Sequence, residues 1–193
     1  MTRALREAAK QMGFTQSSDN LTGSLLATLA ASKPGGKFLE LGTGVGVGSA
    51  WLLSGMDSSS TLVTVEQNAE QVELAQKQLK HDPRISFWAG DGLEYLRQPH
   101  DPFDLIFADT WPGKINHPEL ALNLVAPGGF YVVDDLELAW KEKREIDPPL
   151  DDYLLNIWEG QRCLIKFLQT RKDFLCTELR WSTGLMVCVK KGA

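Results

Sequence analysis

The chain has 193 residues, of which 43% are hydrophobic and 23% charged. These proportions are typical of a folded globular domain and argue against a disordered chain. The formal net charge of −5 argues against DNA or structured RNA as the partner, because phosphate backbones are bound by basic surfaces. No segment has the length and apolarity of a signal peptide or a membrane span, so we expect a cytoplasmic protein with no membrane partner.

The first 33 residues form a helical preamble to a single domain, residues 1–193. Within this preamble the stretch 21–31 is apolar enough to pack on a sheet or to lie over a cleft as a lid. From residue 37 onward, short apolar runs alternate with helical stretches. The expected strands are 37–41, 61–65, 85–89, 103–108 and 129–133.

Helices are expected over 47–53 and after residue 69, between these strands. Strands that alternate with helices predict parallel pairing, right-handed crossovers and helices on both faces of the sheet. Further on, we expect an exposed charged loop over 141–152 and one long helix over 153–170. Strands over 174–179 and 185–190 have a short connection and predict a terminal antiparallel hairpin. The expected fold is α/β, a doubly wound, Rossmann-like and mostly parallel sheet of seven strands.

The three cysteines are Cys163, Cys176 and Cys188, which are widely spaced and form no Cys-x-x-Cys pair. An odd and sparse set argues against a disulfide framework and against a zinc site. We therefore expect buried thiols in a reducing compartment.

A glycine-rich loop, Glu40-Leu-Gly-Thr-Gly-Val-Gly-Val-Gly48, follows the first expected strand. Glycines at alternate positions allow a sharp turn and the close approach of a ligand to the backbone. The dinucleotide fingerprint would need a glycine at Val47 or Ser49, and the P-loop pattern would need a Gly-Lys-Ser/Thr that does not follow. This spacing disfavours an NAD(P) oxidoreductase and fits a nucleoside sulfonium ligand, although a purely structural turn is an alternative.

Acidic residues also stand at the ends of the next two strands, where ligands bind in open α/β sheets. Glu66 ends the second strand, at a position from which a carboxylate can accept hydrogen bonds from both ribose hydroxyls. Asp91, in Gly90-Asp91-Gly92, could accept a hydrogen bond from an adenine amino group, or it could cap a helix. Together with Glu40 these carboxylates favour an adenosyl ligand.

These motifs resemble those of the class I S-adenosylmethionine-dependent methyltransferases. More narrowly they are similar to the small-molecule O-methyltransferases of the catechol and caffeoyl-CoA type, over about residues 21–191. The resemblance implies S-adenosylmethionine as cofactor and the O-methylation of a small hydroxylated acceptor. Members are monomers or dimers, so a homodimer stays open. The cofactor contacts that the resemblance implies are Glu40, Gly42, Thr43, Gly44, Gly46, Glu66, Gln67, Asp91, Gly92 and Asp109.

Three further carboxylates follow the fourth and fifth strands: Asp109, Asp134 and Asp135. Oxygen ligands at neighbouring strand ends suit Mg²⁺ or another divalent cation, which could lower the pKa of an acceptor hydroxyl. Metal-dependent members of the family carry Asp-Asn where this chain has Asp134-Asp135, so the site would differ in charge. Alternatively the pair caps the following helix, and Asp109 contacts the cofactor alone.

The identity of the general base stays open. The catechol branch of the family carries a lysine three residues after the first Asp, where this chain has Pro112, with Lys114 two positions later. Lys114 could swing into the site, or Asp109 could serve, since crowded like charges raise one pKa. His117 is a further candidate, although a lone histidine at a helix start is more commonly a surface residue. Trp111 is expected to wall the substrate cleft.

Other functions remain open because the cofactor half of such a site would look the same in each. They are methylation of a nitrogen, methylation of a protein or RNA target, and a methyltransferase-like fold that binds a nucleoside without turnover. We expect the acceptor to be selected by residues 1–33, 111–117 and 141–152, which lie outside the regular alternation of strands and helices.

Overall fold

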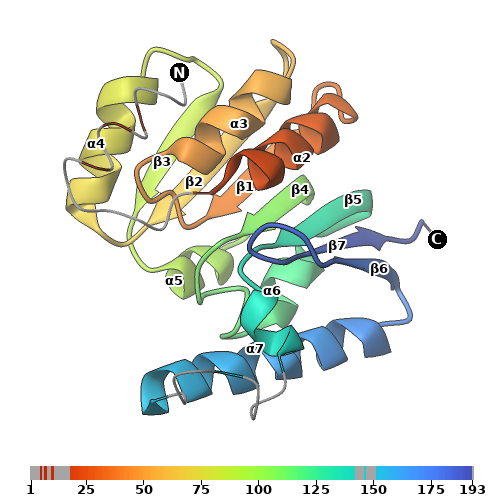
Figure 1. The fold of residues 1–193 in the computed structure, drawn as a ribbon. Helices are drawn as coiled ribbons and strands as arrows, with labels where there is room; N and C mark the ends of the chain where they lie inside the picture. The colour runs from red at the N-terminus through yellow and green to blue at the C-terminus, as the bar shows by residue number, and fades with distance from the viewer. Residues whose placement is uncertain are drawn as a thin grey trace.

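The computed structural model describes residues 18–141 and 151–192, with the single positions 5, 7, 10 and 146. Within this part all seven strands join one sheet, in the order β3-β2-β1-β4-β5-β7-β6 (Figure 1). The strands are β1 (Lys37–Leu41), β2 (Thr61–Glu66), β3 (Ile85–Ala89), β4 (Phe103–Ala108), β5 (Val125–Val133), β6 (Phe174–Leu179) and β7 (Leu185–Lys190). The helices are α2 (Asn20–Ala31), α3 (Val47–Gly55), α4 (Ala69–Leu79), α5 (Gly92–Leu96), α6 (Pro118–Asn123), the 3-10 helix η1 (Glu137–Trp140) and α7 (Asp152–Thr170).

Strands β3, β2, β1, β4 and β5 run parallel, and β7 enters antiparallel between β5 and β6. The winding reverses at β1, which pairs with β2 on one side and with β4 on the other. Leu41 is in register with both Val65 and Ala108. The carboxyl ends of these three strands therefore meet at one edge, where open α/β sheets bind their ligands. The predicted doubly wound sheet and its terminal hairpin are confirmed.

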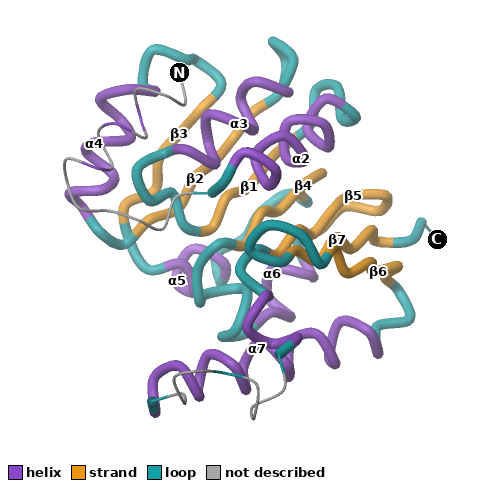
Figure 2. The backbone as a smooth tube through the Cα atoms, in the orientation of Figure 1, coloured by secondary structure: helices purple, strands orange, loops and turns teal. Residues whose placement is uncertain are grey.

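Helices cover both faces of the sheet, and each face has its own buried cluster (Figures 1 and 2). On one face α2 and α3 pack together, and Leu26 and Leu52 are fully buried there. On the other face α5, α6 and α7 contribute Leu96, Leu122 and Leu168. Buried on both faces, the central strands are nearly continuous apolar runs, as parallel strands of this kind require.

The apolar stretch 21–31 lies in helix α2, which packs against α3. Asp19 begins it by accepting hydrogen bonds from the backbone N–H groups of Leu21 and Thr22. Most of the preamble before residue 18 and most of the expected loop over 141–152 lie outside the described residues. In the part of the chain that is described, no helix is long and apolar enough to cross a membrane.

Strand β5 is longer than the apolar run that predicts it. It begins at Val125 and continues through the Ala126-Pro-Gly-Gly turn, with a register shift against β4 between Phe103 and Leu105. A bulge of this kind adds residues to one strand without ending its pairing, so the turn motif before residue 129 does not mark the start of the strand.

The expectation of three buried, unpaired thiols is wrong. Cys176 on β6 faces Cys188 on β7 in the antiparallel register, and the two form a disulfide with a Cα–Cα distance of 4.0 Å. Cys163 on α7 is free but exposed. Spacing along the chain does not reveal a cross-strand pair, because the register of the hairpin brings these two residues together.

Candidate functional site

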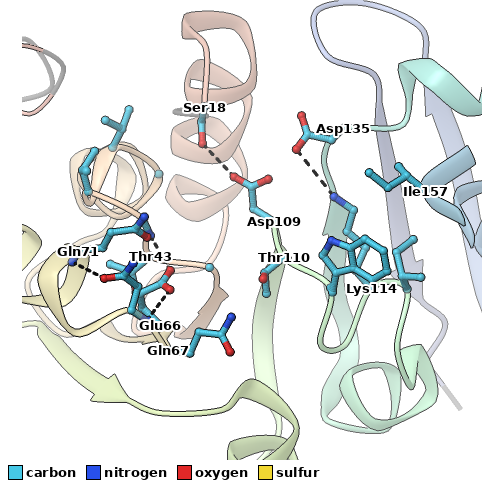
Figure 3. Close-up of a pocket in the computed structure, with 18 of the residues that line it drawn as sticks. Ser18, Thr43, Glu66, Gln67, Gln71, Asp109, Thr110, Lys114, Asp135 and Ile157 are labelled. Carbon is cyan, nitrogen blue, oxygen red and sulfur yellow. Dashed lines mark hydrogen bonds and ion pairs between the residues drawn. The ribbon is translucent and has the colours of Figure 1, made fainter. Parts of the chain in front are cut away.

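A cavity of about 390 Å³ lies where the winding of the sheet reverses, at the carboxyl ends of β1, β2 and β4. Figure 3 shows its two sides, with Glu66 on one side and Lys114 on the other. The lining residues are Ser18, Gly42, Thr43, Gly44, Val45, Val47, Gly48, Glu66, Gln67, Asn68, Gln71, Asp109, Thr110, Trp111, Lys114, Ile115, Asp135, Tyr153, Ile157 and Gln161.

The glycine loop forms the wall beside β1. Gly42 has a φ of +98°, and a Cβ added to it would lie 2.7 Å from the carbonyl oxygen of Asp109. The backbone N–H groups of Gly42 and Thr43 donate to the Val65 carbonyl, which ties the loop to β2. Gly46, also expected at the cofactor, is not among the lining residues. It begins α3 with a φ of +91°, and a Cβ there would lie 2.9 Å from Leu79 Cδ1, so this glycine allows close packing against α4, and its cofactor contact stays a prediction.

Glu66 lies at the edge of this loop, as the sequence predicts. Its Oε2 accepts a hydrogen bond from the Gly44 N–H at 3.0 Å, and its Oε1 accepts one from the Asn68 N–H at 2.9 Å. The carboxylate is thereby fixed at the wall of the cavity, next to Gln67. A fixed carboxylate with remaining lone pairs can accept further hydrogen bonds from a ligand's hydroxyl groups.

Glu40 lies behind the loop and is buried. Its Oε2 accepts hydrogen bonds from the hydroxyls of Ser49 and Thr64, the latter at 2.6 Å. Burial raises the pKa of Glu40 to about 7 against the opposing effect of these hydrogen bonds. Its Oε1 has no partner in the described part of the chain and faces Gly48 in the cavity wall. A buried carboxyl oxygen without a partner fits a ligand that donates a hydrogen bond from the cavity side.

Asp91 and Gly92 do not line the cavity. The Asp91 carboxylate begins α5 by accepting hydrogen bonds from the N–H groups of Leu93 and Glu94, at 2.8 and 2.9 Å. A Cβ on Gly92 would lie 2.8 Å from the Cβ of Pro112. In the structure Asp91 therefore caps a helix, which is one of the two roles that the sequence allows. Its contact with adenine stays a prediction.

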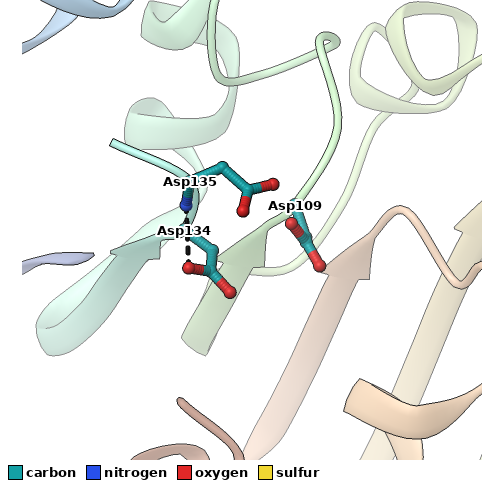
Figure 4. A group of neighbouring side chains, drawn as sticks. All are labelled: Asp109, Asp134 and Asp135. Atoms are coloured by element: carbon teal, nitrogen blue, oxygen red, sulfur yellow. Dashed lines mark hydrogen bonds between the residues drawn. The ribbon is translucent and has the colours of Figure 1, made fainter. Parts of the chain in front are cut away.

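The three carboxylates after β4 and β5 converge (Figure 4). One oxygen from each of Asp109, Asp134 and Asp135 lies within 4.8 Å of the other two. Burial, followed by the charge of neighbouring carboxylates, raises the pKa of Asp134 to about 6 and that of Asp109 well above its usual range. Asp134 is held by the Thr183 hydroxyl and by the Asp135 N–H. Neither member of the pair caps η1, which begins without a side-chain hydrogen bond.

The Asp135 backbone is left-handed, with a φ of +58°. This conformation costs a residue with a side chain about 1–2 kcal/mol. The buried Gln161 of α7 holds it: its amide nitrogen donates to the Asp135 carbonyl, and its amide oxygen accepts from the Ala139 N–H at 3.0 Å. Gln161 therefore joins α7 to the loop that carries the carboxylates.

Lys114 reaches the same cluster through a tight turn. The backbone N–H groups of residues 114, 115 and 116 all donate to the Trp111 carbonyl, and the Tyr131 hydroxyl donates to the Gly113 carbonyl. This turn directs the buried Lys114 side chain into the cavity, where its Nζ lies 3.9 Å from Asp135 Oδ2 (Figure 3). The lysine is thus at the site although Pro112 occupies the position where the catechol branch carries its own.

His117 is not part of the site. Its ring is exposed, its Nδ1 lies 2.8 Å from Glu119 Oε1, and it does not line the cavity. The residue begins α6 in a left-handed conformation, with a φ of +56°. The sequence allows His117 to be either a base or a surface residue. The structure shows the second, a surface residue at a helix start that lies next to Glu119.

The outer wall of the cavity combines Trp111 with α7. The Trp111 ring stacks on Tyr153 with a centroid distance of 6.3 Å and an interplanar angle of 30°. Tyr153, Ile157 and Gln161 line the cavity at a spacing of four residues, which places them along one face of the helix. Sequence reasoning predicted Trp111 but missed these three. Their regular spacing was the available signal, and it could not say that this face meets a ligand rather than the core.

Comparison with known proteins places the chain among methyltransferases. A family model described as a methyltransferase domain matches residues 39–136. A Mycobacterium ulcerans protein named "Putative O-methyltransferase" is 33% identical over 138 residues, which cover 67% of this chain and 59% of that protein. A Mycobacterium avium protein of the same name is 34% identical over 119 residues, 58% of this chain and 53% of that protein. The chain therefore spans a little more than half the length of these curated relatives.

Two solved structures share the fold over nearly the whole chain. The O-methyltransferase TomG of Streptomyces achromogenes, crystallised in complex with SAM, has a TM-score of 0.82 and 26% identity, covering 99% of this chain and 89% of its own. The O-methyltransferase of Bacillus cereus, in complex with SAH, also has a TM-score of 0.82, with 22% identity over 98% of this chain and 90% of its own.

Proposed function

The chain belongs to the methyltransferase domain family, and on that premise we propose that it is an S-adenosylmethionine-dependent O-methyltransferase of a small hydroxylated molecule. The observation that carries the proposal is the division of one cavity into two chemically different sides. A glycine loop and Glu66 form one side, and Asp109, Lys114 and Asp135 form the other.

The glycine-loop side suits the cofactor. S-adenosylmethionine supplies an activated methyl group when it is bound. Gly42 and Gly44 would leave its adenosyl part room beside the backbone, and Glu66, with Gln67 alongside, would hold the ribose by accepting hydrogen bonds. The unpartnered Oε1 of Glu40, next to Gly48, would hold the ammonium group directly or through water. The complexes of TomG with SAM and of the Bacillus cereus enzyme with SAH support this choice of ligand.

The carboxylate side suits an acceptor with a hydroxyl group. Holding that oxygen in line with the methyl group can supply about 7–11 kcal/mol of the barrier reduction. The buried Lys114 ammonium, paired with Asp135, stabilises the negative charge that develops on the oxygen. Without a bound cation, Asp109, whose pKa is raised by burial and by Asp134, is the group on this side best suited to take up the hydroxyl proton.

The acidic cluster also fits a divalent cation. Asp109, Asp134 and Asp135 each place one oxygen within 4.8 Å of the other two, and carboxylate oxygens are hard donors of the kind that Mg²⁺ prefers, with waters completing its shell. Asp109, Asp134 and Asp135 would hold the cation. When ionised, these three carboxylates outweigh the single positive charge of Lys114, so the site is net negative before the cation binds. Bound there, the cation would lower the pKa of the acceptor hydroxyl.

Calorimetric titration with S-adenosylmethionine, S-adenosylhomocysteine and NADH tests the cofactor. We expect saturable binding of the two adenosyl ligands and none of NADH, and binding of NADH alone would overturn the proposal.

Methyl transfer from labelled cofactor to matched phenols and amines tests the acceptor atom. Transfer to amines alone would favour N-methylation.

For the metal, Asp134→Asn is expected to lower Mg²⁺-dependent turnover. Activity insensitive to EDTA would contradict the cation site.

A further inference from the structure

A second cavity, of about 500 Å³, lies between η1, α7 and the region where β6 ends. None of the residues that line it also lines the candidate active site. The long helix α7 contributes to both cavities. Tyr153, Ile157 and Gln161 face the first, whereas Arg162 and Lys166 line the second, which we call the α7 groove.

Positive charge gathers in the α7 groove. Arg162 and Lys166 stand one helical turn apart, and Arg180 directly follows β6. The carboxylate of Glu178, also in the groove, already accepts hydrogen bonds from Gln169 at 2.7 Å and from Arg180 at 3.2 Å. Within the described ranges, Arg162 and Lys166 form no ion pair with a carboxylate. The Arg162 guanidinium donates a hydrogen bond to the Ala139 carbonyl and lies 4.8 Å from the centroid of the Trp158 ring, which leaves further N–H donors for an anion.

The wall of the groove beside these cations is apolar and partly flat. The Trp140 indole lines it, with the Arg180 guanidinium 5.4 Å from the ring centroid, next to the buried Ile165.

We propose that the α7 groove binds an organic anion, a phosphate or carboxylate carried on a planar apolar group. Arg162 and Lys166 pair with the anionic head, since guanidinium and ammonium groups are the usual partners of phosphate and carboxylate. The planar part packs on the indole of Trp140 and on Ile165. The proposal is independent of the methyl transfer proposed above, because it uses no residue of the first cavity.

Cys163 provides a reporter within the groove. It lines the cavity, it is exposed, and the chain's other two cysteines are paired in the disulfide. We expect phenyl phosphate to slow the alkylation of Cys163 by iodoacetamide several-fold at saturation, and phenol to have little effect. An unchanged alkylation rate at every concentration of phenyl phosphate would overturn the site. Equal protection by inorganic phosphate would overturn the role of the planar group.

A charge-removal pair tests the two cations. The double variant Arg162→Gln/Lys166→Gln is expected to weaken the binding of phenyl phosphate, measured by calorimetry, at least about tenfold. The control Lys77→Gln/Lys80→Gln removes the same charge from exposed positions in and directly after α4 and is expected to bind as the unaltered chain does. Equal affinity in the two double variants would contradict the assignment of the anion to Arg162 and Lys166.

Discussion

The two sides of the first cavity are built in different ways. On the glycine-loop side the unusual backbone conformations fall on glycines, at Gly42 and Gly44, and Glu66 at the end of the neighbouring strand β2 fixes the loop. On the carboxylate side a left-handed conformation falls on Asp135, which has a side chain, and Gln161 of α7 holds it. Figure 3 shows the two sides facing each other across Asp109.

This difference shows which side of the cavity carries the backbone strain and the electrostatic repulsion. Glycine adopts a positive φ at little cost, so the glycine-loop side is nearly free of strain. The carboxylate side keeps buried like charges together and a strained aspartate, which a fold retains where the arrangement is used. We infer that the first side provides general cofactor binding, and that the second provides the chemistry and the choice of acceptor.

The largest effect is expected at Lys114. Lys114→Met removes a buried cation from the acceptor side and is expected to lower kcat about 10²–10³-fold, the usual loss for one group that stabilises a developing oxyanion. The affinity for S-adenosylmethionine is expected to change less than about twofold, because the variant leaves the glycine-loop side intact. His117→Gln, on the same connection but outside the cavity, is the control. An equal loss of cofactor affinity in Lys114→Met would remove the distinction between the two sides.

The next effect concerns pH and the buried Glu40. Its pKa rises from 4.5 to about 7 on folding, so the unfolded chain releases this proton at lower pH than the folded one. The free energy of unfolding is therefore expected to fall as pH rises from about 4.5 to 7, with Glu40 contributing about 3 kcal/mol of the decline.

Glu40→Gln should remove that part of the slope in urea unfolding measured with EDTA present. The residual slope includes contributions from Asp109 and Asp134, whose pKa values are raised in the same direction. An unaltered slope in Glu40→Gln would show that the carboxyl group is not protonated in the folded chain.

A pair of glycine variants tests the backbone of the cofactor side. Gly42→Ala combines a φ of +98° with a Cβ 2.7 Å from the Asp109 carbonyl oxygen, whereas Gly128→Ala has a φ of +76° and a Cβ whose nearest neighbour is Lys33 Nζ at 4.0 Å. Both variants carry the conformational cost of about 1–2 kcal/mol. Only Gly42→Ala is expected to weaken S-adenosylmethionine binding, about tenfold or more. Equal cofactor affinities in the two variants would contradict the role of this loop.

The smallest effect is expected at Gln161. Gln161→Leu leaves the Asp135 carbonyl and the Ala139 N–H without their partner, which is expected to destabilise the fold by about 1 kcal/mol. Because Asp135 then loses its fixed orientation, the dissociation constant for Mn²⁺ should also rise several-fold. Gln169→Leu, which breaks an exposed hydrogen bond of the same helix, is the control. Stability loss with unchanged Mn²⁺ affinity would make Gln161 a packing residue alone.

By itself the sequence determined the strands, apart from the start of β5, and the glycine loop with Glu66 at the neighbouring strand end. Each of these depends on local features: apolar periodicity, glycines at fixed spacing, and a carboxylate at a strand end such as Glu66. Even the acidic cluster was predictable, because parallel strands place their carboxyl ends at one edge.

Tertiary structure alone decided the rest. Lys114 entered the cavity through a turn fixed by Trp111 and Tyr131, and Cys176 met Cys188 through the register of the hairpin. The α7 face reached the cavity by packing beneath the sheet, far from the glycine loop in sequence. Periodicity specifies which residues share a face, but only the packing of whole elements specifies what that face meets.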